Sequence, residues 1–121
     1  MRDVLREVRA WYDEGLGLAT VVGTRQSAPR QPGAAMAVSA AGEAAGSVSG
    51  GCVEGAVYEV AQSVMASGEP SLQRYGVSDD DAMAVGLTCG GIIDVFVQPV
   101  SAQTFPELPV IASAMRLAAA A

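Results

Sequence analysis

The chain changes from extended to helical character at residues 46–54, which read Gly46-Ser47-Val48-Ser49-Gly50-Gly51-Cys52-Val53-Glu54. Before this stretch, runs of small residues over 34–39 and 44–49 flank a turn at Ala41-Gly42, which predicts a β-hairpin. After it, valines and alanines recur at helical spacing over 53–67, and Gly68 and Pro70 end the segment. We therefore expect a hairpin, a tight glycine turn and a helix in succession.

The same spacing rules place the remaining elements. Apolar residues at helical intervals predict a helix over 2–14, followed by a strand over 18–22 and a loop over 24–33. Further along we expect a strand over 72–75, a short helix over 78–85 and a strand that begins after Gly91 and closes at Pro99. This order predicts a single-domain α+β fold over 1–100, with a mixed β-sheet and helices packed on one side. Residues 101–121 form a proline- and alanine-rich segment that begins a helix or a linker.

The composition excludes several classes of chemistry. The 121 residues carry 13 acidic and 7 basic side chains, a net charge of -6, and every basic residue is arginine. Without histidine or lysine, the chain cannot hold a Ser-His-Asp or Cys-His catalytic set, a histidine-ligated metal or a P-loop lysine. The acidic balance argues against nucleic acid and anionic membranes as partners. No export signal or membrane span is visible, so we expect a cytoplasmic protein with reduced cysteines.

Two cysteines in mirrored settings are the main candidate site: Gly50-Gly51-Cys52 precedes a predicted helix, and Cys89-Gly90-Gly91 precedes a predicted strand. Paired glycines let a backbone approach a ligand closely and adopt positive φ, so the two loops could together form a cleft of amides and sulfur. The predicted helix start favours anions and a thiolate at Cys52. The alternatives are that both cysteines are buried and only pack in the core, or that they form a disulfide. The spacing of the two cysteines matches neither a zinc site nor a thioredoxin motif.

Three further charged features have competing interpretations. Arg30 lies in a loop stiffened by Pro29 and Pro32, and it could bind a phosphate or be a solvated surface charge. The acidic run at 79–81 is better explained by a helix start than by a magnesium site, so no metal ligands are predicted. Glu54 could act as a general acid or base, but a favourable charge at the helix start is the simpler interpretation.

Several motifs together resemble the N-terminal domain of the XdhC/CoxI family. They are Val21-Val22-Gly23-Thr24, Ser27-Ala28-Pro29-Arg30, Pro32-Gly33-Ala34, the stretch 46–54 and Gly86-Leu87-Thr88-Cys89-Gly90-Gly91, and the match spans roughly 18–99. The resemblance implies an accessory factor, and not an enzyme, for molybdenum hydroxylases such as xanthine dehydrogenase or carbon monoxide dehydrogenase. Such factors bind the molybdenum cofactor (molybdopterin), cooperate with a cysteine desulfurase while the sulfido ligand is installed, and deliver the product to the apoenzyme.

By motif, the family's two cofactor-binding cysteines fall on Cys52 and Cys89. Longer members carry a Rossmann-like domain after the matched region. We expect this domain to be absent from the sequence 1–121, either because a separate polypeptide supplies it or because the chain is a short member or a truncated form. The thin, alanine-rich core also makes a homodimer plausible.

The chemistry of the residues agrees with this cofactor. Molybdopterin carries a phosphate, a flat polar heterocycle and a metal, which call for amides, arginine and soft sulfur. The expected site therefore consists of Gly50, Gly51, Cys52, Cys89, Gly90, Gly91 and Arg30. The alternatives are a thiol-dependent redox protein that uses Cys52 and Cys89, a phosphate-binding module at the Gly50-Gly51 turn, and a regulatory subunit that binds only protein. The absence of a histidine base weakens the first, and the absence of a G-x-G-x-x-G motif weakens the second.

Overall fold

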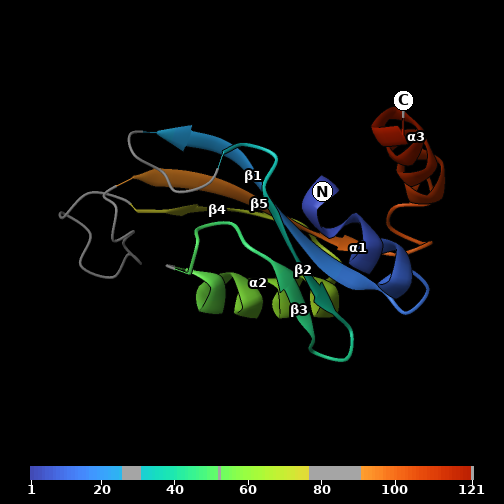
Figure 1. Cartoon of the computed structure of the whole chain (residues 1–121). Helices are drawn as coiled ribbons and strands as arrows, with labels where there is room; N and C mark the ends of the chain where they lie inside the picture. The colour runs from blue at the N-terminus through green and yellow to red at the C-terminus, as the bar shows by residue number, and fades with distance from the viewer. Residues whose placement is uncertain (26–30, 52, 77–90, 121) are drawn as a thin grey trace.

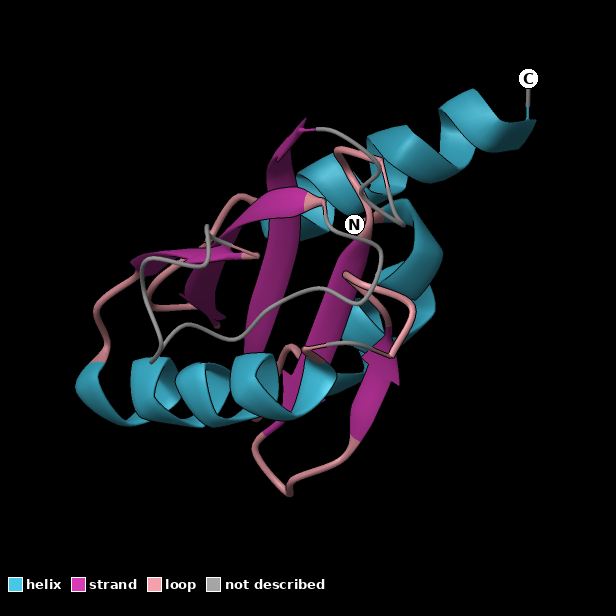
Figure 2. Ribbon diagram, turned by 90° about the vertical axis from the view of Figure 1, so that its left-hand side faces the viewer, coloured by secondary structure: helices cyan, strands magenta, loops and turns pink. Residues whose placement is uncertain are grey.

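The chain folds into a five-stranded antiparallel sheet with helices on both faces (Figures 1 and 2). The computed structural model describes residues 1–25, 31–51, 53–76 and 91–120. The elements in chain order are the 3-10 helix η1 (Arg2–Val4), α1 (Leu5–Trp11), β1 (Leu16–Arg25), β2 (Ala35–Ser39), β3 (Ala44–Gly46), α2 (Glu54–Ser67), β4 (Ser71–Tyr75), β5 (Ile92–Val100) and α3 (Leu108–Ala120).

Strand β1 lies at the centre of the sheet, whose order is β3-β2-β1-β5-β4. It pairs with β2 on one side and β5 on the other, and a bulge between Val21 and Gly23 shifts its register with β5. At one end of the sheet, Arg25 lies opposite Ile92 and Tyr75 lies opposite Ile93. The end of β1, the end of β4 and the start of β5 therefore lie at the same end of the sheet.

Alternating side chains build a separate hydrophobic core on each face of the sheet. Ala19, Val21 and the β5 residues Ile93, Val95 and Val97 face α2. Packing between α2 and the sheet is close: a Cβ at Gly17 would lie 2.9 Å from that of Ala61.

The core on the opposite face contains the side chains of the central strands that point away from α2. Leu16 and Leu18 of β1 pack there with Val4, Val8 and Leu108 from η1, α1 and α3. The placement of all the helices on one side of the sheet was therefore wrong. The period-2 alternation of β1 gives the sheet two apolar faces, and each must be covered.

The α+β class is confirmed, and the structure corrects its details. The four described strand pairings are all antiparallel, where a mixed sheet was expected. The helix expected over 53–67 is α2, which ends at Gly68 with φ of 78°. Strand β3 is shorter than the expected 44–49 because residues 47–49 belong to the loop before α2.

The C-terminal segment and the long loops have different outcomes. Residues 108–120 form α3, so the C-terminal segment does contain a helix. The short helix expected over 78–85 and half of the loop expected over 24–33, residues 26–30, lie outside the described residues. Within the described ranges, none of the helices has the length and apolarity needed to cross a bilayer.

We predict that Gly46→Ala lowers the free energy of unfolding by about 2–4 kcal/mol. Gly46 has a φ of 82°, and a methyl group there would overlap the carbonyl oxygen of Ala35 and the side chain of Val4. The matched control is Gly55→Ala in the first turn of α2, where a Cβ meets no atom within 4 Å. This control should be neutral or stabilise by about 0.5 kcal/mol. Chemical denaturation of both variants checks the contrast, and equal stabilities would contradict the packing of β3 on η1.

Candidate functional site

The loop between β3 and α2 is held by a single carboxylate, that of Glu54. One oxygen of Glu54, Oε2, accepts hydrogen bonds from Ser47 Oγ at 2.8 Å and from the amides of Val48 and Ser49 at 2.8 and 2.9 Å. The other, Oε1, accepts from Ser49 Oγ at 2.5 Å and from the Gly51 amide at 2.9 Å. Five donors therefore converge on one side chain. We call residues 47–51 together with Glu54 the Glu54 clamp.

The two serine hydroxyls extend the clamp to the neighbouring amides. Ser47 Oγ accepts from the Gly50 amide at 2.8 Å, and Ser49 Oγ accepts from the Val53 amide at 2.9 Å. The backbone amides of Gly51 and Val53, the residues on either side of position 52, are thus both hydrogen-bonded. Gly50 and Gly51 have φ of 70° and 111°, which L residues with a side chain rarely adopt. The paired glycines expected to permit positive φ do so here.

The hydrogen bonds keep Glu54 ionised. Partial burial opposes the charged form, but the donors from Ser49, Ser47 and Val48 outweigh it and lower the pKa of Glu54 to about 2. A carboxylate with so low a pKa holds no proton to donate at neutral pH and is a weak base, so it is poorly suited to general acid–base catalysis. Of the two interpretations of Glu54 from the sequence, the structural one is the better description. The charge acts on the loop before the helix more than on the helix itself.

The outer surface of the clamp is bare backbone. Gly50 and Gly51 are exposed, and a Cβ built at Gly51 meets no atom within 4 Å. A ligand can therefore approach the backbone here without meeting a side chain. The inward-facing amides of Val48, Ser49 and Gly51 are already used by Glu54, so an anion cannot bind to them while the clamp is closed.

The described flanks of the two diglycine loops share one hydrophobic core. Val48 and Val53 flank the first loop, and Ile93 follows the second by two residues; all three pack in one cluster with Tyr75. Gly91 is buried directly before β5, in contrast to the exposed Gly50 and Gly51. Four of the predicted site residues lie outside the described residues: Arg30, Cys52, Cys89 and Gly90.

Sequence reasoning missed the role of Ser47 and Ser49. A signal for it exists in the spacing, because hydroxyls and glycines over 47–51 supply donors, and Glu54 follows at a distance that lets its side chain fold back. The prediction of no metal ligands is untested for the acidic run 79–81, which the structure does not describe. Among the residues that it does describe, no group of three acidic or sulfur ligands converges.

Comparison with known proteins identifies relatives of this chain. A family model for the XdhC and CoxI family matches residues 11–76. The chain belongs to this family. The matched region contains the whole Glu54 clamp and Cys52, whereas Cys89 follows it along the chain.

Two relatives extend this result. The uncharacterized protein YqeB of Escherichia coli K12 is 36% identical over 80 residues, which cover 66% of this chain and 15% of YqeB. The crystal structure of a xanthine dehydrogenase from Bacillus halodurans superposes with a TM-score of 0.74 at 28% identity, over 91% of this chain and 33% of that one. This XdhC/CoxI family chain thus spans a third of the solved chain and a smaller part of YqeB.

We predict that Glu54→Gln destabilises the fold by about 1–2 kcal/mol at neutral pH. The depressed pKa corresponds to about 3 kcal/mol, which solvent screening at this partly exposed carboxylate reduces. Because the pKa is lower in the folded state than in the unfolded chain, the stabilisation is complete above pH 4.5 and is lost as the pH falls towards 2.

Denaturation of wild type and Glu54→Gln over this pH range measures the difference. Glu43→Gln is the control, since the Glu43 main chain bonds to Ser39 in the β2–β3 turn, away from the clamp. A stability difference that does not shrink in acid would contradict an ionised clamp.

Proposed function

We propose that this XdhC/CoxI family protein binds the molybdenum cofactor and assists its sulfuration and insertion into a molybdenum hydroxylase. The single observation that carries this proposal is the Glu54 clamp within the family motif. It holds the backbone amides of Gly51 and Val53, the residues on either side of Cys52, and leaves bare backbone at Gly50 and Gly51. Such a loop can bring a thiol and a flat ligand close together.

The clamp also limits which part of the cofactor this loop receives. A phosphate group would compete with Glu54 for the amides of Val48 and Ser49, which the carboxylate already holds at 2.8 and 2.9 Å. The phosphate therefore requires another donor, and Arg30 is the proposed one. The exposed diglycine backbone suits the heterocycle or the metal end of the cofactor, where soft sulfur from Cys52 and Cys89 is the fitting ligand type.

Shared packing supports the participation of both cysteines. The flanks of the two loops, Val48 and Val53 for one and Ile93 for the other, belong to the same hydrophobic cluster. In the proposed site, Gly90 gives the Cys89 loop a close backbone approach to the ligand, and Gly91, which is buried directly before β5, anchors that loop to the sheet.

The proposed role is that of an accessory factor and not of an enzyme. The Glu54 carboxylate is fully ionised and occupied at neutral pH, and the chain has no histidine to move protons. Its proposed partners are a cysteine desulfurase, which supplies sulfur, and the apoenzyme of a xanthine dehydrogenase or carbon monoxide dehydrogenase type. A separate Rossmann-domain polypeptide and a second copy of the chain complete the proposed assembly. The cytoplasm, where the cofactor and these partners would meet, is the proposed location.

We predict that Cys52→Ala and Cys89→Ala each lower the amount of bound pterin by about tenfold or more, since loss of a metal ligand exceeds loss of an outer-shell contact. The experiment co-expresses each variant with cofactor biosynthesis and measures pterin and molybdenum per chain. Cys52→Ser and Cys89→Ser serve as matched variants that keep the size and polarity of the side chain but remove the sulfur, and they should fail equally.

Equal loading of wild type and all four variants would exclude the thiols from binding. If the wild type and the variants all fail to bind pterin, and mild oxidant forms a disulfide between Cys52 and Cys89 in the wild type, the thiol-dependent redox protein becomes the better description. Thermal unfolding of each variant separates loss of binding from loss of fold.

A further inference from the structure

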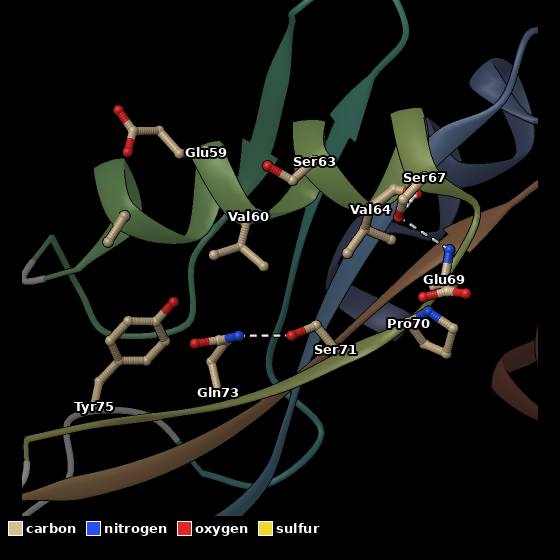
Figure 3. A pocket seen from close by; sticks show the side chains of 11 residues that line it. Glu59, Val60, Ser63, Val64, Ser67, Glu69, Pro70, Ser71, Gln73 and Tyr75 are labelled. Atoms are coloured by element: carbon tan, nitrogen blue, oxygen red, sulfur yellow. Dashed lines mark hydrogen bonds between the residues drawn. The ribbon is translucent and has the colours of Figure 1, made fainter.

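A groove of about 680 Å³ runs between α2 and the edge strand β4 (Figure 3). One wall is the face of α2 that carries Ala56, Val60 and Val64. The other is the face of β4 that carries Ser71, Gln73 and Tyr75. In the sheet that the structure describes, β4 pairs only with β5, so the groove lies at the edge of the molecule. Its volume is that of a small-molecule site.

Tyr75 closes one end of the groove and carries a polar atom without a partner. Its side chain is only 6% exposed, and its hydroxyl points towards α2 (Figure 3). The phenolic oxygen is buried and makes no hydrogen bond within the described structure. Burial raises the pKa of Tyr75, so the hydroxyl keeps its proton. Buried hydroxyls in proteins are nearly always hydrogen-bonded, so an unpartnered one in a groove indicates a missing ligand.

The other polar side chains that line the groove are acidic or neutral. Glu59 and Glu69 contribute carboxylates, and Ser63 and Ser67 contribute hydroxyls. The one side-chain amide, Gln73, donates from Nε2 to Ser71 Oγ at 2.6 Å. None of the described residues that line the groove is basic. Two carboxylates without a basic neighbour among these residues favour a ligand that carries positive charge and N–H donors.

We propose that this groove binds a small organic cation with ammonium groups on an aliphatic body. Val60, Val64 and Pro70 offer apolar surface to the aliphatic part. One ammonium group meets Glu69 at the end away from Tyr75, and the Tyr75 oxygen accepts an N–H from the other. The Glu59 carboxylate, which points away from β4 in Figure 3, adds negative charge at the rim. The site is separate from the Glu54 clamp and independent of the function proposed above, because its acidic lining repels an anionic pterin.

The test uses 1,5-diaminopentane as the probe, with 1,5-pentanediol as a neutral control of the same length. The melting temperature and titration calorimetry of the purified chain should show saturable binding of the diamine and none of the diol. Tyr75→Phe is the decisive variant. Because the hydroxyl has no partner in the free protein, its removal should leave the ligand-free melting temperature unchanged or higher, and weaken the diamine about two- to tenfold.

The carboxylates are tested in the same way. Glu69→Gln should weaken the diamine about two- to fivefold and Glu59→Gln by less, whereas Glu107→Gln, next to the start of α3, should leave its affinity unchanged. The proposal is overturned if Tyr75→Phe lowers the ligand-free melting temperature, since the hydroxyl would then have a partner in the protein. It is also overturned if all variants bind the diamine equally, which would be attraction to the net negative charge. Binding of a lysine-rich peptide without binding of the diamine would overturn the small-molecule assignment.

Discussion

The convergence of five donors on the Glu54 carboxylate is the constraint on which the rest of this structure depends. Short loops between a strand and a helix leave backbone amides without partners, and most proteins satisfy them with a side chain that precedes the helix. Here the first residue of α2 folds back and binds the loop that leads into it. Gly50 and Gly51 permit the reversal, and their missing side chains leave the outer surface open. The loop that Glu54 holds in place is therefore also part of the proposed cofactor site.

The two proposed sites lie at different parts of α2 and differ in their chemistry. In the loop before α2, the amides bond to Glu54 and the backbone beside Cys52 is exposed. This arrangement suits a flat ligand and a metal that binds soft sulfur. The groove between α2 and β4 exposes carboxylates and hydroxyls, which suits a cation. A chain of net charge -6 would need local positive or neutral surface to accept the proposed anionic cofactor. In the clamp, N–H and O–H donors surround the charge of Glu54.

Much of the fold followed from the sequence because local signals agreed with one another. The apolar spacing over 53–67 and the Gly68 stop gave α2, and the alternation of Ile93, Val95 and Val97 gave β5. The coverage of both sheet faces could not be read from local patterns, because it depends on Leu16 and Leu18 pointing away from α2 and on η1 and α3 meeting there. The clamp was hidden for a similar reason. Glu54 looks like an ordinary helix-start residue until the positive φ angles of Gly50 and Gly51 turn the loop amides towards it.

The central claim is that the Cys52 and Cys89 loops enclose one cofactor molecule. The most direct measurement treats the purified protein with a short thiol-bridging reagent, with and without bound cofactor, and maps the products by mass spectrometry. The account predicts an intramolecular bridge between Cys52 and Cys89 in the cofactor-free protein and protection of both thiols in the loaded one. Independent modification of the two thiols, unchanged by the cofactor, would contradict it.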